Sequence, residues 1–480
     1  MAENASGADG NAERRRRPNV VLINCDDLGY GDLGCYGSTL NATPAIDRLA
    51  AEGLRFTSFY MASPVCSPSR GAMLTGCYPP RIGFGSFDGF PVLFPGHALG
   101  LPPSEISLAA MLSAAGYRTQ MIGKWHCGDQ PEFLPTNHGF DHYFGLPYSN
   151  DMGRQVDTPS FFPEMPPLPL MNDDEVIEQQ PDQASLTERY VTEAVRFMRS
   201  GGHEPFFLYF AHMYVHTPIY VQPRFADTSR NGPYGAAVEA IDWATAALMH
   251  EVEALGLGDD TIVIFTSDNG SLGNNPAPVG GDGSLLGGSN EPLRGHKGQT
   301  WEGGQRVPAI VRWPCRIAPG RVSDTVVSSL DLYPTLAACC GARVPDDRTI
   351  DGRDITSLLV DESATSPLDE FLYYWMNDLE AIRVGRWKLH FAKRGIEMCE
   401  LYDLDTDIAE TTDVADARPD VVRDLTERAE RARNSLGDAR LERIGSDVRP
   451  IGRVAEPQQL TTFDADHPYY MAEYDLGDRG

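Results

Sequence analysis

Cys66 and Arg70 have the residue types and the spacing for chemistry on an anion. Cys66 opens the run Cys66-Ser67-Pro68-Ser69-Arg70, and we expect a helix over Ser69–Thr75 directly after it. A helix N-terminus presents free N–H groups and a positive partial charge, and Arg70 adds a full charge one turn further on. The segment could therefore hold an anionic group beside the thiol. Considered alone, such a cysteine is more commonly an inert structural thiol.

Two pairs of side chains with oxygen ligands each follow a predicted buried strand. They are Asp26 with Asp27 after residues 19–25, and Asp268 with Asn269 after residues 261–267. The carboxyl ends of parallel strands meet at one edge of a sheet, so both pairs could face the same point. Hard oxygen ligands without histidine suit Ca²⁺ or Mg²⁺ better than Zn²⁺. Either pair alone more often caps a helix or a turn, but two pairs at matching strand ends favour a metal site.

Lysine and histidine supply further candidates. Only four of the 40 basic residues are lysine, and two of these, Lys124 and Lys297, lie in glycine-flanked segments that we expect to be turns. A surface lysine is the ordinary alternative, but rarity and location favour a need for a compact ammonium group. His126 and His216 each follow a predicted strand end and could transfer protons near neutral pH. The sequence leaves His212 and His296 undecided and predicts ordinary structural roles for His97, His138, His142, His203, His250 and His390.

These candidates need a sheet that brings them together. Apolar strands alternate with helices, which predicts an α/β fold with a mostly parallel sheet. The expected strands are 19–25, 54–60, 118–122, 206–211 and 261–267, with helices at 43–53 and 107–115. From about residue 366, short strands at 371–375, 381–384 and 387–392 and a charged helix at 419–435 predict a smaller α+β unit. We therefore expect a disordered extension over 1–17, a catalytic domain over 18–365 and a C-terminal subdomain over 366–480.

The overall composition argues against several classes of protein. With 68 acidic and 40 basic residues, the net charge of −28 disfavours nucleic acid or an anionic membrane as a partner. No apolar run approaches the roughly 20 residues that span a bilayer. The first residues lack the apolar core of a signal peptide, so we expect a cytoplasmic location. The nine cysteines form no CxxC pair and no zinc-like spacing, so neither a zinc site nor a disulfide framework is expected.

The run from Cys66 to Gly76 resembles the CxPSRxxxLTG signature of the formylglycine-dependent sulfatases, in which the cysteine is oxidised after translation. Residues 116–126 resemble the family's second signature, at the expected distance downstream. Further family-like segments are Asp26-Asp27, residues 145–149, residues 216–218, residues 268–270, the run GHKGQTWEGG around Lys297, and residues 401–404. The resemblance covers nearly the whole chain and is greatest to the arylsulfatases. It implies an alkaline-phosphatase-like sheet sandwiched by helices, and hydrolysis of sulfate monoesters.

The resemblance also implies roles for single residues. One Ca²⁺, or Mg²⁺ in its place, would be held by Asp26, Asp27, Asp268, Asn269 and the modified Cys66. Arg70 would hold the modified residue, while the sulfate or the leaving oxygen would be contacted by Lys124, Lys297, His216 and Ser149. The hydrated aldehyde, a gem-diol, would attack sulfur and form a covalent sulfo-enzyme. His216, with Lys297, would protonate the leaving oxygen, and His126 would deprotonate the second hydroxyl so that sulfate is expelled. A formylglycine-generating maturation enzyme is then a required partner.

Two other functions remain open at this point. A phosphomonoester or phosphonate hydrolase could use the same scaffold, because a fold alone does not fix a function. An alkaline phosphatase would be expected to carry a Ser or Thr nucleophile and a histidine-rich two-zinc site, and neither stands near Asp26 or Asp268. A non-catalytic calcium-binding protein with an unmodified Cys66 is the third hypothesis. For a sulfatase, an aryl sulfate is the expected assay substrate and a sulfated carbohydrate a candidate natural one.

Overall fold

The computed structural model describes residues 17–154, 165–202, 204–273, 288–368 and 370–469, and the expected extension 1–17 lies outside them except for Arg17. The large unit contains strands β1 Asn19–Cys25, β2 Leu54–Tyr60, β3 Leu99–Gly100, β4 Arg118–Lys124, β5 His142–Leu146, β6 Pro169–Asn172, β7 Glu175–Gln179, β8 Phe206–Ala211, β9 Thr261–Ser267, β10 Arg306–Arg312, β11 Arg321–Ser323 and β12 Val327–Ser328. Its helices are α1 Pro44–Glu52, α2 Cys66–Thr75, α3 Leu108–Ala114, α4 Gln183–Ser200, α5 Pro223–Ala226, α6 Gly232–Ala254, α7 Glu302–Gln305, α8 Leu332–Cys340 and α9 Thr356–Val360.

All of these strands except β3 form one sheet, in the order β11-β2-β10-β9-β1-β8-β4-β5-β6-β7, with β12 beside β2. The five strands from β9 to β5 run parallel to one another, while β10 runs antiparallel between β9 and β2. The prediction of an α/β fold with a mostly parallel sheet is therefore confirmed. β1 lies inside the sheet and is buried on both faces, as its continuous apolar sequence predicted.

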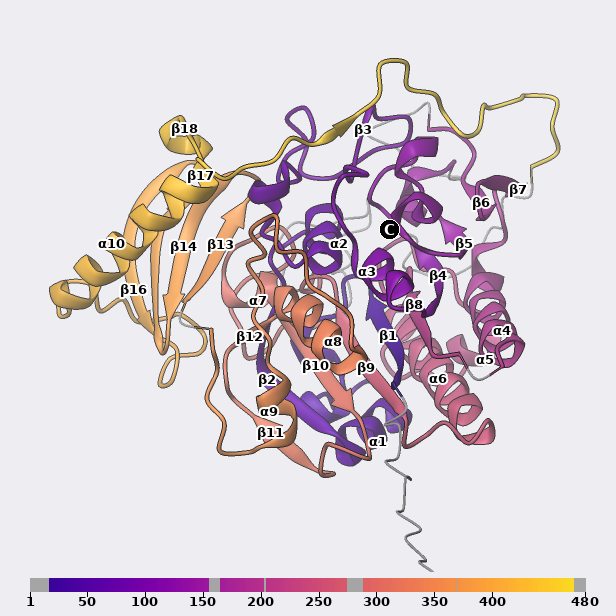
Figure 1. Ribbon diagram of the computed structural model, residues 1–480, viewed down its shortest axis with the longest axis horizontal. Helices are drawn as coiled ribbons and strands as arrows, with labels where there is room; N and C mark the ends of the chain where they lie inside the picture. The colour runs from indigo at the N-terminus through magenta and orange to yellow at the C-terminus, as the bar shows by residue number, and fades with distance from the viewer. Residues whose placement is uncertain (1–16, 155–164, 203, 274–287, 369, 470–480) are drawn as a thin grey trace, which may run out of the picture.

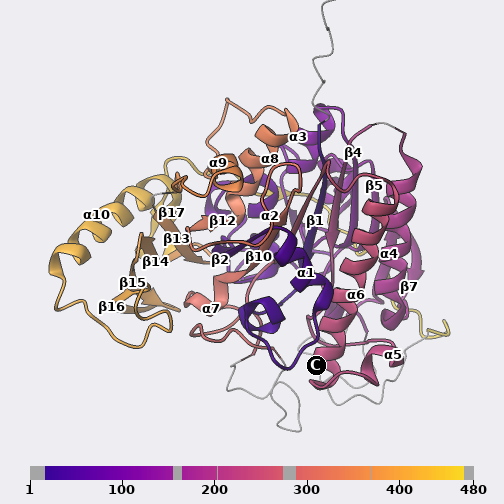
Figure 2. The ribbon, with the colours of Figure 1, turned by 90° about the horizontal axis from the view of Figure 1, so that it is seen from below.

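Helices cover both faces of this sheet. Successive side chains of a strand point to opposite faces, so Val20 and Leu22 of β1 join one apolar core and Val21 and Ile23 join the other. The first core contains residues of α2, α3 and α8, and the second contains residues of α1, α4 and α6. Figure 2 shows α3 and α8 on one side of the labelled strands and α1 and α6 on the other. Among the described residues, no helix is long and apolar enough to cross a membrane.

A smaller unit follows in the chain. Strands β13 Glu370–Trp375, β14 Asp378–Val384, β15 Trp387–Lys393 and β16 Ile396–Asp403 form an antiparallel sheet, followed by α10 Pro419–Leu436 and the short strands β17 Gly437–Asp438 and β18 Arg443–Ile444. Leu425 and Ala429 of α10 pack with Phe371 and Ile382 of the sheet in a third core. Figure 1 shows this orange and gold unit beside the large sheet.

The chain then returns to the large unit. The short strand β19 Gly452–Arg453 pairs with β3, and the side chain of Gln130 exchanges hydrogen bonds with the backbone of Gln458, at 2.8 and 2.9 Å. In Figure 1 this yellow segment runs from the small unit across the top of the large one. The last described residues, which the sequence grouped with the C-terminal subdomain, therefore pack against the larger unit.

Candidate active site

The predicted site residues gather at one edge of the large sheet. β1, β4, β8 and β9 are parallel, and β2 points the same way because both it and β9 are antiparallel to β10. The carboxyl ends of these strands thus meet, and the segments that follow them carry the candidates. The buried members are Asp26, Asp27, Cys66, Arg70, Lys124, His126, Ser149, His216, Asp268 and Asn269. Lys297 joins them from the loop before α7, with its side chain 12% exposed.

The four predicted metal ligands that carry side-chain oxygens lie together. The backbone N–H of Asp27 donates to Oδ1 of Asp268 at 3.2 Å, and Nδ2 of Asn269 donates to Oδ1 of Asp27 at 2.7 Å. Oδ1 of Asp26 and Oδ1 of Asn269 are buried and have no hydrogen-bond partner among the described residues. A buried polar atom without a partner is costly, so two acceptors left open beside three carboxylates fit a divalent cation. Ligand atoms of Asp26, Asp268 and Cys66 also lie within 4.8 Å of one another.

Three cations surround these carboxylates. Nζ of Lys124 lies 2.5 Å from Oδ2 of Asp26 and also donates to the hydroxyl of Ser149 at 3.1 Å. Nε of Arg70 donates to Oδ2 of Asp268 at 2.9 Å, and its Nη2 lies 2.8 Å from the same oxygen. Nζ of Lys297 lies 2.8 Å from Oδ1 of Asp27. Each of the three aspartates among the predicted metal ligands is therefore paired with a cation.

Two backbone details depart from the sequence prediction. Helix α2 begins at Cys66 rather than Ser69, because Pro68 falls in the first turn, where the helix does not require its missing N–H. Cys66 is thus the first residue of the helix. Lys124 is the last residue of β4 rather than part of a turn. A strand position directs its ammonium group toward Asp26 and buries it completely.

Burial and neighbouring charges shift the pKa of three groups in the cluster, namely Asp26, Asp268 and Cys66. Burial opposes ionisation of Asp26, but Lys124 and then His216 outweigh it and hold the pKa of that carboxyl well below its usual range. Burial and the charge of Asp26 raise the pKa of Asp268 to about 6. Burial also raises the pKa of the Cys66 thiol, although Lys124 and Lys297 act to lower it. An unmodified Cys66 is therefore a neutral thiol near pH 7, which is a poor nucleophile.

The two candidate proton-transfer histidines differ in their settings. Nε2 of His126 lies 3.0 Å from the carbonyl of Leu93, and its Nδ1 has no partner among the described residues. Burial and the charge of Lys124 hold the pKa of His126 far below its usual value, so the ring is neutral. Nδ1 of His216 lies 2.5 Å from the carbonyl of Thr217, and its Nε2 lies 3.8 Å from Oδ2 of Asp27. Asp27 and His126 both adopt left-handed backbone, with φ of 60° and 59°, a strained conformation common at functional sites.

The two histidines that the sequence left undecided make structural contacts. His212 accepts the backbone N–H of Tyr214 at 3.0 Å and bonds Thr187 at 3.2 Å, and burial lowers its pKa to about 3. Nδ1 of His296 bonds the carbonyl of Lys297 at 2.9 Å. Sequence reasoning missed Leu93, whose N–H donates to Ser67 and whose carbonyl holds His126. Leu93 acts through its backbone, so its residue type carries no signal of this role.

Comparison with known proteins places this arrangement in a family. The family model described as Sulfatase matches residues 18–342. The chain belongs to the sulfatase family. A second model, described as N-sulphoglucosamine sulphohydrolase, C-terminal, matches residues 296–435 of the sulfatase and so joins the Lys297 segment to the small sheet.

The sulfatase resembles characterised relatives over most of its length. Arylsulfatase A of Homo sapiens is 42% identical over 399 residues, which are 79% of this chain and 76% of that protein. N-acetylgalactosamine-6-sulfatase of Rattus norvegicus is 38% identical over 412 residues, 80% of this chain and 74% of that protein. The solved structure of Ps i-CgsB in complex with k-i-k-neocarrahexaose has a TM-score of 0.75 and 31% identity, covering 87% of this chain and 92% of that chain. The predictions of family, fold and sulfate ester hydrolysis are confirmed, and the roles of single residues stay predictions.

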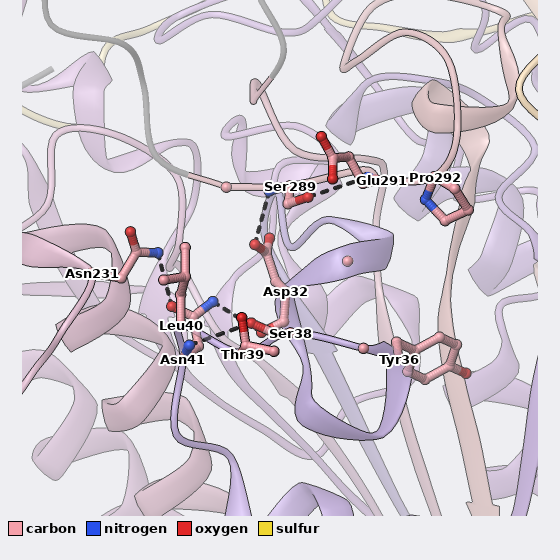
Figure 3. Close-up of a pocket in the computed structure, with 13 residues that line it drawn as sticks. Asp32, Tyr36, Ser38, Thr39, Leu40, Asn41, Asn231, Ser289, Glu291 and Pro292 are labelled. Atoms are coloured by element: carbon pink, nitrogen blue, oxygen red, sulfur yellow. Dashed lines mark hydrogen bonds between the residues drawn. The ribbon is translucent and has the colours of Figure 1, made fainter.

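A separate pocket lies near this site. It has a volume of about 600 Å³ and is lined by 13 residues, among them Asp32, Asn41, Asn231, Ser289 and Glu291 (Figure 3). Asp32 accepts the backbone N–H groups of Gly29 and Ser289, as well as the hydroxyl of Tyr234. Burial raises the pKa of Asp32 to about 7. None of the pocket's lining residues is a predicted site residue of the sulfatase.

The buried pair between Arg70 and Asp268 supports a prediction about stability. In metal-free protein, Arg70→Met leaves Asp268 without its main cation, and losing one partner of a buried ion pair costs about 3–5 kcal/mol. We expect urea unfolding of the metal-free sulfatase to show a loss of that size. Arg48→Met, which breaks the exposed pair with Glu52, is the control and should change stability far less. Equal losses in the two variants would contradict the assignment of a strong buried pair.

Proposed function

We propose that this sulfatase hydrolyses sulfate monoesters of aryl or carbohydrate alcohols, with a nucleophile made from Cys66. The observation that carries the proposal is the convergence of Cys66, Lys124 and Lys297 on the acidic cluster at the sheet edge. A neutral buried thiol is poorly suited to attack sulfur, which supports conversion of the residue by a formylglycine-generating maturation enzyme. Once converted and hydrated, residue 66 would supply one hydroxyl for attack and a second through which the product leaves.

A divalent cation is the second component, and Ca²⁺ is the ion we propose, with Mg²⁺ as the alternative. The residues that would hold it are Asp26, Asp27, Asp268 and Asn269, together with the converted residue 66. The two open acceptors on Asp26 and Asn269 support this assignment, and all of the proposed protein ligands are oxygens. When bound, the ion would act as a Lewis acid on the sulfate oxygens and favour an ionised nucleophile.

The cationic residues of this chain would bind and orient the sulfate group. Lys124, steadied by Asp26 and Ser149, and Lys297, held by Asp27, present ammonium groups to an anion. Lys297 would also stabilise the charge that develops on the leaving oxygen, a preorganised electrostatic contribution that is often the largest in catalysis. Arg70 holds Asp268 and the carbonyl of Lys124, so it would fix the geometry around residue 66.

The two histidines would move the protons. The carbonyl of Thr217 accepts a hydrogen bond from Nδ1 of His216, which leaves Nε2 as the atom that would carry a proton to the leaving oxygen. The carbonyl of Leu93 likewise accepts from Nε2 of His126, so the open Nδ1 would accept the proton of the second hydroxyl on residue 66. The low pKa of His126 keeps that ring neutral and able to act as a base.

A comparison of sulfate and phosphate esters tests this function against a phosphohydrolase on the same scaffold. We expect matured protein to hydrolyse 4-nitrophenyl sulfate with a kcat/KM at least about 100-fold above that for 4-nitrophenyl phosphate, because the chain belongs to a family whose relatives are sulfatases. Rates of nitrophenol release under identical conditions provide the measurement. A preference for the phosphate ester would contradict the proposal. The similarity to N-acetylgalactosamine-6-sulfatase makes sulfated carbohydrates the first natural candidates to screen.

A further inference from the structure

The segment that follows Lys297 is held by the small sheet. Glu302, the first residue of α7, is fully buried, and its carboxylate accepts hydrogen bonds from four side chains. Three of the donors are the hydroxyl of Tyr60 at 2.5 Å, the hydroxyl of Tyr373 at 2.8 Å and Nζ of Lys388 at 2.8 Å. Tyr60 ends β2, whereas Tyr373 and Lys388 belong to β13 and β15. In both Figure 1 and Figure 2, α7 lies beside the four-stranded sheet.

Lys388 is the centre of this network. Its side chain is fully buried, and Nζ lies 2.8 Å from Oε1 of Glu302 and 2.9 Å from Oε1 of Glu410. Glu410 in turn accepts the backbone N–H of Glu302 at 2.8 Å and bonds Nε2 of His390 at 2.7 Å. The ammonium group of Lys388 therefore holds the side chain of Glu302 directly and the backbone N–H of Glu302 through Glu410. Arg306 also reaches the Glu302 carboxylate, at 3.3 Å.

The small sheet also holds the residues between Lys297 and Glu302. Nη2 of Arg394 donates to the carbonyl of Gly298 at 2.5 Å. Thr300 donates to Oε2 of Glu380 at 2.5 Å and accepts from Nζ of Lys393. All three residues of the sheet come from β14, β15 or the turn after β15. The segment from Gly298 to Glu302 is thus fastened to the small unit at alternate positions.

The other side of the same segment faces the nucleophile. The backbone N–H of Gly298 donates to the carbonyl of Pro64 at 2.8 Å, two residues before Cys66. The N–H of Lys297 donates to the carbonyl of Ser271, in the segment that follows β9. The backbone around Lys297 is therefore hydrogen-bonded to segments at the edge of the large sheet, and the residues that follow Lys297 are hydrogen-bonded to the small unit. A shift of Gly298–Glu302 would move its ammonium group relative to Asp27 and Cys66.

We propose that Lys388 is a positioning residue for the sulfatase reaction: by binding Glu302 and Glu410 it fixes Gly298–Glu302 and, through that segment, the ammonium group of Lys297. The small unit then contributes to the geometry of the active site as well as to the fold. The proposal rests on the proposed role of Lys297 at the leaving oxygen. That role predicts a change in how strongly kcat depends on the leaving group, which a purely structural loss of stability would not cause.

Variants at Lys388 test the proposal through leaving-group sensitivity. Lys388→Met removes the ammonium, and Lys388→Met with Glu410→Gln removes one charge of each sign, which limits the cost of an uncompensated buried carboxylate. We expect both variants to lose at least about 10-fold more kcat on phenyl sulfate than on 4-nitrophenyl sulfate, because the poorer leaving group depends more on a cation at the leaving oxygen. Folded fraction and aldehyde content are measured for each protein so that kcat refers to matured, folded enzyme.

A double-mutant cycle with Lys297→Met completes the test. If Lys388 acts through Lys297, its substitution should cost little further kcat once Lys297 is methionine. Arg433→Met is the matched control, since Arg433 forms a buried pair with Asp438 at 2.8 Å in the same unit and does not contact residues 298–302. That variant should lose stability and keep the wild-type leaving-group sensitivity.

Two results would overturn the proposal while leaving the function intact. They are folded Lys388 variants with wild-type leaving-group sensitivity, and full additivity of the Lys388 and Lys297 substitutions. A Lys297→Met protein that keeps the wild-type rate on phenyl sulfate would instead overturn the role proposed for Lys297, and the positioning role with it.

Discussion

Cys66→Ser is expected to lower kcat for an aryl sulfate by a factor on the order of 10⁴ or more, the scale seen when a catalytic nucleophile is removed. Serine keeps a hydroxyl at the start of α2 but has no second hydroxyl through which sulfate could be eliminated. The variant should therefore release at most one equivalent of alcohol per protein and then stop. Rapid-mixing measurement of nitrophenol release gives both the amplitude of that first turnover and the residual steady rate.

The control for this substitution is another buried thiol. Cys340 of α8 is fully buried, has no contact with the acidic cluster and lies in the apolar core. Cys340→Ser should lower stability but leave kcat per folded molecule near the wild-type value. A Cys66→Ser protein that turns over many equivalents at the native rate would exclude a nucleophile made from this residue.

Asp27→Asn is expected to have the second large effect, on both metal affinity and rate. The Asp27 carboxylate contacts Lys297 and Asn269, its backbone N–H donates to the Asp268 carboxylate, and Asp27 would be a direct metal ligand. Substitutions that only support a ligand cost about 10–100-fold in affinity or activity, so loss of a charged ligand should cost at least about 100-fold. Calcium titration by calorimetry after chelator treatment measures the affinity, and initial rates with and without added Ca²⁺ measure activity.

Asp32→Asn provides the comparison, because Asp32 is also a buried aspartate close in sequence. Its carboxylate accepts hydrogen bonds from two backbone N–H groups and a tyrosine, and it lines the separate pocket of Figure 3. This variant should keep the wild-type affinity for Ca²⁺. Chelator-treated wild-type protein that retains full activity, or an Asp27→Asn protein that binds Ca²⁺ normally, would refute the metal site.

The sequence predicted β1, β8 and β9 well because these strands are buried on both faces. Continuous apolar runs such as 19–25 and 261–267 coincide with β1 and β9. β16 was missed because most of its residues are exposed or half-buried, so no regular apolar pattern marks it. Strand β4 was predicted two residues short, since Gly123 and Lys124 resemble a turn in composition. The return of the chain to β3 could not be predicted, because a two-residue pairing leaves no periodic signal.

The residues of the site likewise divide into those that the sequence could place together and those that it could not. Residues that follow strands, such as Asp26 and Asp268, could be placed together by topology before any side-chain position was known. Individual hydrogen bonds and ion pairs between distant segments of the chain could not be predicted in this way. Lys388 and Glu302 are 86 residues apart, and the backbone of Leu93 holds His126 without any constraint on its own side chain. Such links depend on how distant segments of the chain pack together, which periodicity and motifs do not encode.

The most direct test is the mass of the peptide that contains residue 66, measured together with activity. Protein produced with a formylglycine-generating enzyme should contain a peptide that has lost sulfur and two hydrogens and gained one oxygen. Across preparations with different degrees of conversion, kcat per molecule should rise in proportion to that fraction. Fully active protein in which residue 66 is an intact cysteine would contradict the account, including the roles given to the surrounding lysines and histidines.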